Sequence, residues 1–182
     1  MTTLDTLRDS IPDYARDLSL NLGSVLAPTG APGLTQTQIW AVALASAVAS
    51  RNVAFTRDIE SLAAAHLDAA YVKAARSAAA IMGMNNVYYR FLHLVGDAEY
   101  AQLPARLRMN VIGNPGTPKA DFELLSLAVS AINGCGTCVQ SHENVLREKG
   151  ITEETILAAI RIGSVIHGAA AVLEAESALT AA

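Results

Sequence analysis

Cysteine and aromatic residues are scarce in this chain of 182 residues, which has two cysteines, one tryptophan and 5% aromatic residues in all. Two cysteines are too few for the disulfide framework that holds small secreted domains together. The chain instead has 52% hydrophobic residues and a mean hydropathy of +0.30, enough apolar material for one core. Because alanine is frequent and aromatics are few, we expect closely packed helices, with Ala-rich faces that bury themselves against a second subunit.

Clusters of basic residues are also absent, and the net charge is -4 with a pI near 5.5. Nucleic-acid binding is therefore excluded, because phosphate neutralisation needs clustered Lys and Arg. No basic segment followed by an apolar run opens the chain, so we expect a cytoplasmic protein. The uncharged stretch 18–50 is interrupted by Pro28 and Pro32, and its continuous small or apolar part, 39–49, is too short to span a bilayer. We expect no membrane association.

Apolar residues recur at intervals of three and four along the chain, and strand-like alternation is nearly absent. The pattern predicts an all-α fold. A cap at Thr35 or Thr37 and a stop at Asn133-Gly134 mark helix ends. The predicted helices are 12–22, 39–49, 58–82 with an internal break, 85–95, 122–132, 135–148 and 152–175.

The two halves of the chain resemble each other when one is shifted by 83 residues, which aligns 39–45 with 122–128. We interpret the chain as a single domain, 1–182, built from a duplicated helical unit. Its first half, 1–113, has no reactive side chain at the matching positions, whereas the second half, 114–182, carries a C-x-x-C motif. At this offset Glu123 matches Trp40, Cys135 matches Asn52, Cys138 matches Phe55 and His142 matches Ile59.

Both cysteines lie in the motif Cys135-Gly136-Thr137-Cys138, and His142 follows Cys138 by four residues, on the same helical face. Two thiols at this spacing can close a disulfide after one is oxidised, and the histidine can exchange a proton with Cys138. The motif thus predicts a dithiol redox centre. Two alternatives stay open: a zinc-binding structural module, with His167 as a fourth ligand, and a pair of inert buried thiols.

The full pattern is Glu123, eleven residues, Cys135-x-x-Cys138, three residues and His142. Together with Pro12-Asp13-Tyr14-Ala15, the segment Ala80 to Arg90, Leu107-Arg108-Met109-Asn110 and Asn114-Pro115-Gly116, it resembles the AhpD alkylhydroperoxidases of the carboxymuconolactone decarboxylase-like superfamily. The resemblance covers essentially the whole chain.

That resemblance implies an all-α homotrimer that reduces organic hydroperoxides through a dithiol-disulfide cycle, with no bound cofactor or metal. It implies dihydrolipoamide on an acyltransferase component as reductant, and an AhpC-type peroxiredoxin as a protein that could be reduced in turn. By position, Cys138 is the peroxidatic thiol, Cys135 the resolving thiol that meets lipoamide, and Glu123 with His142 the proton relay. Thr137 stands where some relatives have histidine. A non-redox decarboxylase, the other activity of the superfamily, would not need the cysteine pair.

Simple thiol chemistry favours a proton-donor role for His142. Lowering a thiol pKa from about 8.5 to about 7 raises the thiolate fraction at pH 7 roughly fifteenfold, but the weaker nucleophile loses about fivefold. A general acid for the departing alkoxide contributes roughly 10² to 10⁴. The remaining candidates, His66, His93 and His167, are interpreted as structural, Met82 as core packing and Lys119 as a surface residue.

Overall fold

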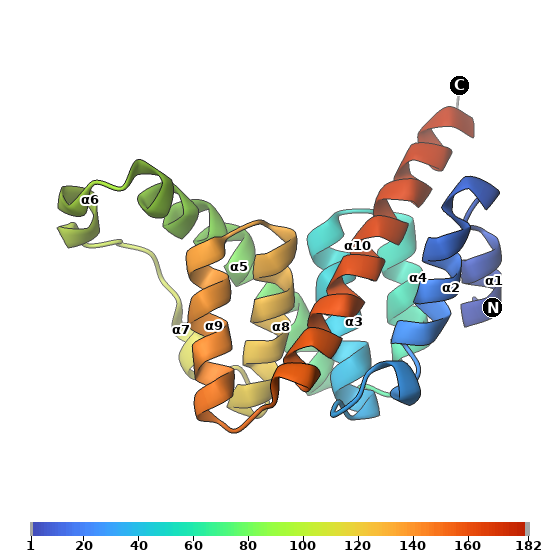
Figure 1. The fold of residues 1–182 in the computed structure, drawn as a ribbon, viewed down its shortest axis with the longest axis horizontal. Coiled ribbons are helices and arrows are strands. Elements are labelled where there is room, and N and C mark those ends of the chain that lie inside the picture. The colour runs from blue at the N-terminus through green and yellow to red at the C-terminus, as the bar shows by residue number, and fades with distance from the viewer. Residues whose placement is uncertain (1, 181–182) are drawn as a thin grey trace.

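The computed structural model of the protein describes residues 2–180, and within them every regular element is helical (Figure 1). The all-α prediction is confirmed. Two 3-10 helices, Asp13–Ala15 and Pro28–Gly30, join the α-helices. The α-helices are α1 (Leu4–Asp9), α2 (Arg16–Val25), α3 (Gln36–Ser50), α4 (Val53–Ala63), α5 (Ala69–Val95), α6 (Ala98–Gln102), α7 (Asn110–Gly113), α8 (Lys119–Ile132), α9 (Gly136–Glu148) and α10 (Glu153–Thr180).

The core forms where α3 packs against α4, α5, α8 and α10. Every residue from 39 to 47 on α3 is buried, as is every residue from 121 to 130 on α8. A helix that is apolar all round must be buried on all sides, and α3 takes that central place. Five of its nine buried residues in 39–47 are alanine or serine, so neighbouring helices can approach closely, as the composition predicts.

One buried polar cluster joins α3, α5 and α8 at the first turn of α8. The carboxylate of Asp121 on α8 accepts hydrogen bonds from Gln38 Nε2 on α3 at 2.7 Å and from Tyr71 Oη on α5 at 2.6 Å. Asp121 is only 8% exposed, so these bonds compensate the loss of its hydration. The hydrogen bond to Asp121 raises the pKa of Tyr71 to about 12, helped by burial and by the negative charges nearby.

The long helices agree with the sequence prediction in most places, and the differences lie in α5 and in the short helices. Thr35 caps α3 through a capping box with Gln38, and the predicted break falls between α4 and α5. The prediction of a separate helix at 85–95 is wrong, because α5 continues without interruption from Ala69 to Val95. The amides of Asn85 and Asn86 do not bond to the α5 backbone, so they do not break it. The short helices α1, capped by Thr3, α6 and α7 were not predicted.

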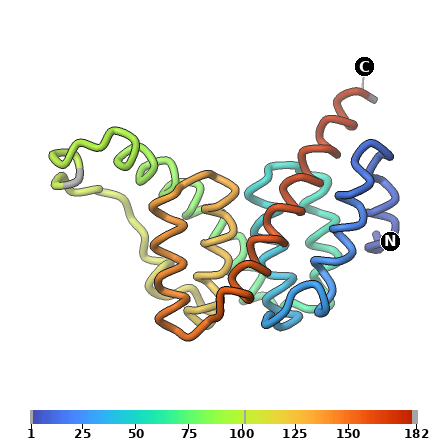
Figure 2. Tube along the Cα trace, viewed as in Figure 1, coloured from blue at the N-terminus to red at the C-terminus, as the bar shows by residue number. Residues whose placement is uncertain are grey.

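The C-terminal end of α5 and the short α6 project away from the helical bundle as an arm (Figures 1 and 2). Phe91 on α5 stacks edge-on against Tyr100 on α6, with ring centroids 5.6 Å apart. Large apolar residues on this arm are exposed to solvent: Val87, Phe91, Leu94, Val95, Tyr100 and Leu103. Such a surface on a single chain is typical of a protein contact.

By length and composition alone, α10 could cross a membrane, and 44% of its apolar window is buried in the protein. The sequence prediction did not identify this segment as a candidate. Its inner face packs against α2, α3 and α8. Ala158, Ala159, Ile162, Ile166 and Ala169 belong to the core. Core packing accounts for the apolar residues on that face.

Candidate active site

The C-x-x-C motif lies where α8 turns into α9. Asn133 caps the C-terminus of α8, and Gly134 takes the left-handed conformation with φ of 69°, which favours glycine. Cys135 is the N-cap of α9, and its Sγ accepts the backbone N–H of Cys138 at 3.4 Å. The sequence therefore places the first sulfur at the positive end of a thirteen-residue helix, where a thiolate is stabilised.

The two cysteines form a disulfide, with their Cα atoms 5.3 Å apart. This separation lies within the usual range for disulfides. Cys135 is completely buried, whereas Cys138 is 6% exposed and lines a cavity. Of the two sulfurs, that of Cys138 faces incoming molecules.

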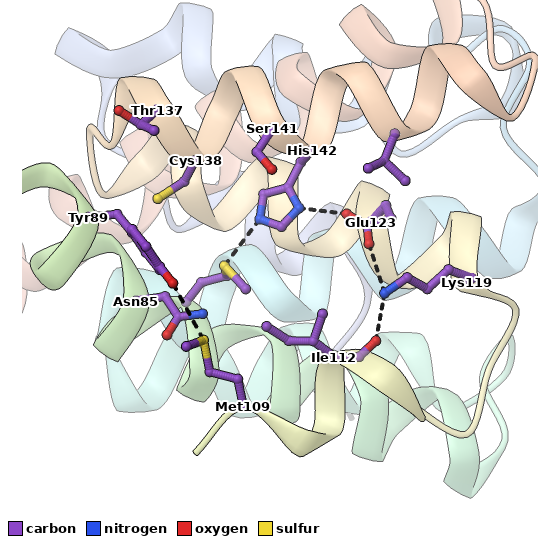
Figure 3. Close-up of a pocket in the computed structure, with 12 residues that line it drawn as sticks. Asn85, Tyr89, Met109, Ile112, Lys119, Glu123, Thr137, Cys138, Ser141 and His142 are labelled. Atoms are coloured by element: carbon purple, nitrogen blue, oxygen red, sulfur yellow. Dashed lines mark hydrogen bonds and ion pairs between the residues drawn. The ribbon is translucent and has the colours of Figure 1, made fainter. Parts of the chain in front are cut away.

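His142 and Glu123 form a short hydrogen bond between α9 and α8. The distance from His142 Nδ1 to Glu123 Oε2 is 2.6 Å, and the two side chains are 12% and 5% exposed (Figure 3). His142 lies one helical turn after Cys138, and both residues line the same cavity. The structure thus brings together the four residues that the sequence singled out.

Lys119 is a part of this site, although the sequence pattern predicts a surface residue. Its Nζ lies 3.1 Å from Glu123 Oε1 and donates to the backbone carbonyl of Ile112 at 2.6 Å. A cation in the first turn of a helix is unfavourable with respect to the helix dipole. The spacing Lys119 to Glu123, one turn apart, together with that unfavourable position could have identified it.

Two opposing influences set the pKa of Glu123. Burial raises it, but the hydrogen bonds and positive charges of His142 and Lys119 outweigh burial and hold the pKa below the ordinary value of 4.5. Glu123 is therefore a carboxylate at neutral pH, although it is only 4% exposed. A buried anion that forms a hydrogen bond with a histidine can hold the orientation of the ring.

Met82 on α5 is the second partner of His142, and not only a core residue as the sequence suggested. Its Sδ lies 3.3 Å from His142 Nε2. A carboxylate and a thioether can both accept hydrogen bonds, so each ring nitrogen of His142 has an acceptor beside it.

The cavity at Cys138 has a volume of about 490 Å³ and lies between α5, α7, α8 and α9 (Figure 3). Its walls are largely apolar, with a few polar groups directed inward, a composition typical of small-molecule sites. The lining residues are Met82, Asn85, Tyr89, Met109, Ile112, Lys119, Glu123, Thr137, Cys138, Ser141, His142 and Val145.

The other histidines take no part in this cavity. His66 stacks on Trp40 with ring centroids 5.2 Å apart, and His167 Nδ1 lies 3.1 Å from Ser50 Oγ. Within residues 2–180, no three His, Cys, Asp or Glu side chains are grouped so as to hold a metal ion. His167, considered as a fourth zinc ligand, is not close to the cysteines in the way that role requires.

Comparison with known proteins first identifies the broad protein family. A model of the carboxymuconolactone decarboxylase family matches residues 98–181, a stretch that includes Lys119 and all four predicted site residues. Full-length relatives then narrow the assignment. The chain is 55% identical to alkyl hydroperoxide reductase AhpD of Rhodospirillum centenum, over 98% of this chain and 94% of the relative.

The chain is also 53% identical to alkyl hydroperoxide reductase AhpD of Solibacter usitatus, over 96% of this chain and 97% of the relative. The identity to the AhpD of Streptomyces griseus is 56%, over 97% and 98% of the two chains. The chain therefore belongs to the AhpD family, as the sequence resemblance indicated.

Proposed function

We propose that this protein is a thiol-dependent alkyl hydroperoxide reductase that cycles between a dithiol and the Cys135–Cys138 disulfide. The observation that carries the proposal is the cavity in which the Cys138 sulfur lies beside the hydrogen-bonded pair His142–Glu123. The names of its relatives, which match it over nearly their full length, support the same activity. A lactone decarboxylase would use neither the cysteine pair nor its disulfide.

In the oxidative half of the cycle, the Cys138 thiolate attacks the terminal oxygen of the hydroperoxide. The S–O bond forms as the O–O bond breaks, and the departing alkoxide takes a proton from His142. The products are an alcohol and a sulfenic acid on Cys138. The Cys135 thiolate, stabilised at the start of α9, then attacks this sulfur, and the S–S bond forms as the S–O bond breaks. The proton that the Cys135 thiol lost on ionising converts the departing hydroxide to water.

In the reductive half, an external dithiol reopens the disulfide, with dihydrolipoamide on an acyltransferase component as the expected donor. The sequence-based assignment had Cys135 meet this donor, but Cys135 is completely buried and Cys138 lines the cavity. We therefore assign the attack to the Cys138 sulfur. Cys135 leaves as a thiolate, because the N-terminus of α9 stabilises its charge.

An AhpC-type peroxiredoxin is the proposed protein partner, and the cytoplasm the proposed location. The relatives are named alkyl hydroperoxide reductase AhpD, and this name implies a relationship with an AhpC-type peroxiredoxin. A dithiol cycle needs a reducing compartment to restore the thiols after each turnover.

We also propose that the fold arose by duplication of a helical unit. Helices α3 and α8 begin 83 residues apart, at Gln36 and Lys119. Helices α4 and α9 also begin 83 residues apart, at Val53 and Gly136. Asn52 caps α4 by accepting the N–H of Phe55, just as Cys135 caps α9 by accepting that of Cys138. The same capping geometry thus carries a structural amide in one half and a reactive sulfur in the other.

A homotrimer is the proposed assembly, as the family resemblance implies. The projecting arm of α5 and α6 supports it, because its exposed side chains Phe91, Leu94 and Leu103 lack a covering surface in the single chain. A second copy of the chain would bury them.

The experiment that tests the redox function counts thiols in the dithiol-reduced protein before and after one equivalent of cumene hydroperoxide. We expect two thiols before and none after, together with a mass decrease of two hydrogens. Two thiols retained with one bound zinc would favour the structural zinc module. Two thiols retained without metal would show an inert pair, and either result would reject the proposal.

A further inference from the structure

Asn85 interrupts the apolar stripe that α5 presents to the core. The buried residues of this helix follow helical spacing through Ala74, Ala78 and Met82, and the next positions of the stripe are Asn85 and Asn86. An aliphatic residue would be expected there, because a buried amide is costly without hydrogen bonds and asparagine is a weak helix former.

The two asparagines are equally buried but differ in their partners. Asn86, 1% exposed, donates to Ser130 Oγ at 2.9 Å and accepts from Asn133 Nδ2 at 2.9 Å, which joins α5 to the end of α8. Asn85 is 4% exposed, and its Oδ1 is buried without a hydrogen-bond partner in the part of the chain that the structure describes. Asn86 therefore holds the fold together, whereas Asn85 does not.

An unpaired buried polar group costs about 1 to 3 kcal/mol of stability. Asn85 lines the cavity that contains Cys138 and His142, and its side chain lies on the Tyr89 and Met109 side of that cavity (Figure 3). A polar group kept at such a cost inside a reactive cavity is typical of one that binds substrate.

We propose that the side-chain amide of Asn85 binds the hydroperoxide group at Cys138, an inference that rests on the proposed peroxidase function. A hydroperoxide has one O–H donor and two acceptor oxygens, and an amide offers a matching carbonyl and N–H donors. Rotation about the last side-chain torsion lets either end of the amide face the cavity.

In the reaction, the amide N–H donates to the oxygen that leaves as alkoxide, while the thiolate forms the S–O bond. His142 supplies the proton that converts the alkoxide to the alcohol, so the amide itself is not consumed. A donor placed where charge develops stabilises the transition state more than the ground state. Loss of one such donor typically slows a reaction by about 10² to 10³.

The test compares Asn85→Leu with the matched control Asn86→Leu. Leucine branches at Cγ as asparagine does, and the adjoining cavity leaves room for its larger volume. Asn85→Leu removes an unpaired carbonyl oxygen, so we expect its melting temperature to equal or exceed that of the parent protein. We expect kcat/KM for cumene hydroperoxide to fall by about 10² or more. Asn86→Leu breaks two hydrogen bonds and should lower the melting temperature.

A second reaction separates substrate binding from damage to the thiol. The second reaction is the alkylation of Cys138 by iodoacetamide in a Cys135→Ser background, which produces no alkoxide. Asn85→Leu should therefore change the alkylation rate by less than about threefold, which is the range that a change in thiol activation alone can produce. Asn85→Ala is the second variant if leucine does not fit. Full peroxidase activity in a folded Asn85 variant would overturn the inference, as would equal losses in both reactions. Absence of activity in the unsubstituted protein would instead reject the proposed function.

Discussion

The substitution His142→Gln tests whether the histidine is a proton donor or only an activator of the thiol. Glutamine can still donate an N–H to Glu123, whose Oε2 now lies 2.6 Å from His142 Nδ1, so the buried carboxylate keeps a partner. Lys119 holds the other carboxylate oxygen at 3.1 Å. The fold around Glu123 should therefore survive, while the acidic proton in the cavity is lost.

The two roles differ in magnitude. Loss of a general acid slows the reaction by about 10² to 10⁴, or roughly 2.7 to 5.4 kcal/mol in the barrier. If His142 only lowered the pKa of the Cys138 thiol from about 8.5 to about 7, its loss would cost about threefold, because the fifteenfold lower thiolate fraction is offset by an about fivefold better nucleophile. The two hypotheses thus differ by more than an order of magnitude.

The assay uses the Cys135→Ser background and follows single reactions of Cys138 with cumene hydroperoxide and with iodoacetamide. We expect His142→Gln to slow sulfenate formation by about 10² or more and alkylation by about threefold, because alkylation needs the thiolate but no proton donor. His93→Gln, at an exposed position near the end of α5, is the matched control and should change neither rate. Equal losses in the two reactions would refute the proton-donor argument and leave His142 as an activator of the thiol.

Three further predictions concern the cysteines, the relay and the assembly. Cys135→Ser should form a dimedone-trappable sulfenate on Cys138 after peroxide, whereas Cys138→Ser should form none, and the opposite labelling would exchange the two roles. Lys119→Met removes one of the two partners that lower the pKa of Glu123, so this pKa should rise. As the solution is acidified, activity and the stability gained from the ionised carboxylate should then be lost at a higher pH than in the parent protein. The same pH dependence in Lys119→Met and in the exposed control Lys149→Met would contradict this prediction. Sedimentation equilibrium should give about 57 kDa, three times the chain mass of 19.0 kDa, and a mass of one chain at micromolar concentration would exclude the trimer.

Most of the fold follows from local chemistry that can be read along the chain. The threonine cap at Thr35, the stop at Asn133-Gly134 and the apolar periodicity of α3 and α8 each depend on residues close in sequence. Where local signals are ambiguous, the prediction is wrong, as at Asn85, where the sequence predicts a helix start. In the structure α5 runs through this position, and the amide of the neighbouring Asn86 bonds to Ser130 on α8 and not to the α5 backbone.

The sequence by itself determined the reactive pair and its histidine, because Cys135, Cys138 and His142 lie within about two helical turns at the start of α9, where spacing fixes their faces. Contacts between helices could not be derived in that way. The tertiary structure alone decided that Lys119 and His142 share the carboxylate of Glu123, that Met82 lies beside the other ring nitrogen, and that Oδ1 of Asn85, which lines the cavity, has no partner among the described residues. Residues from α5, α8 and α9 meet there only because the Ala-rich core lets these helices approach closely, and a helical period carries no information about which faces meet.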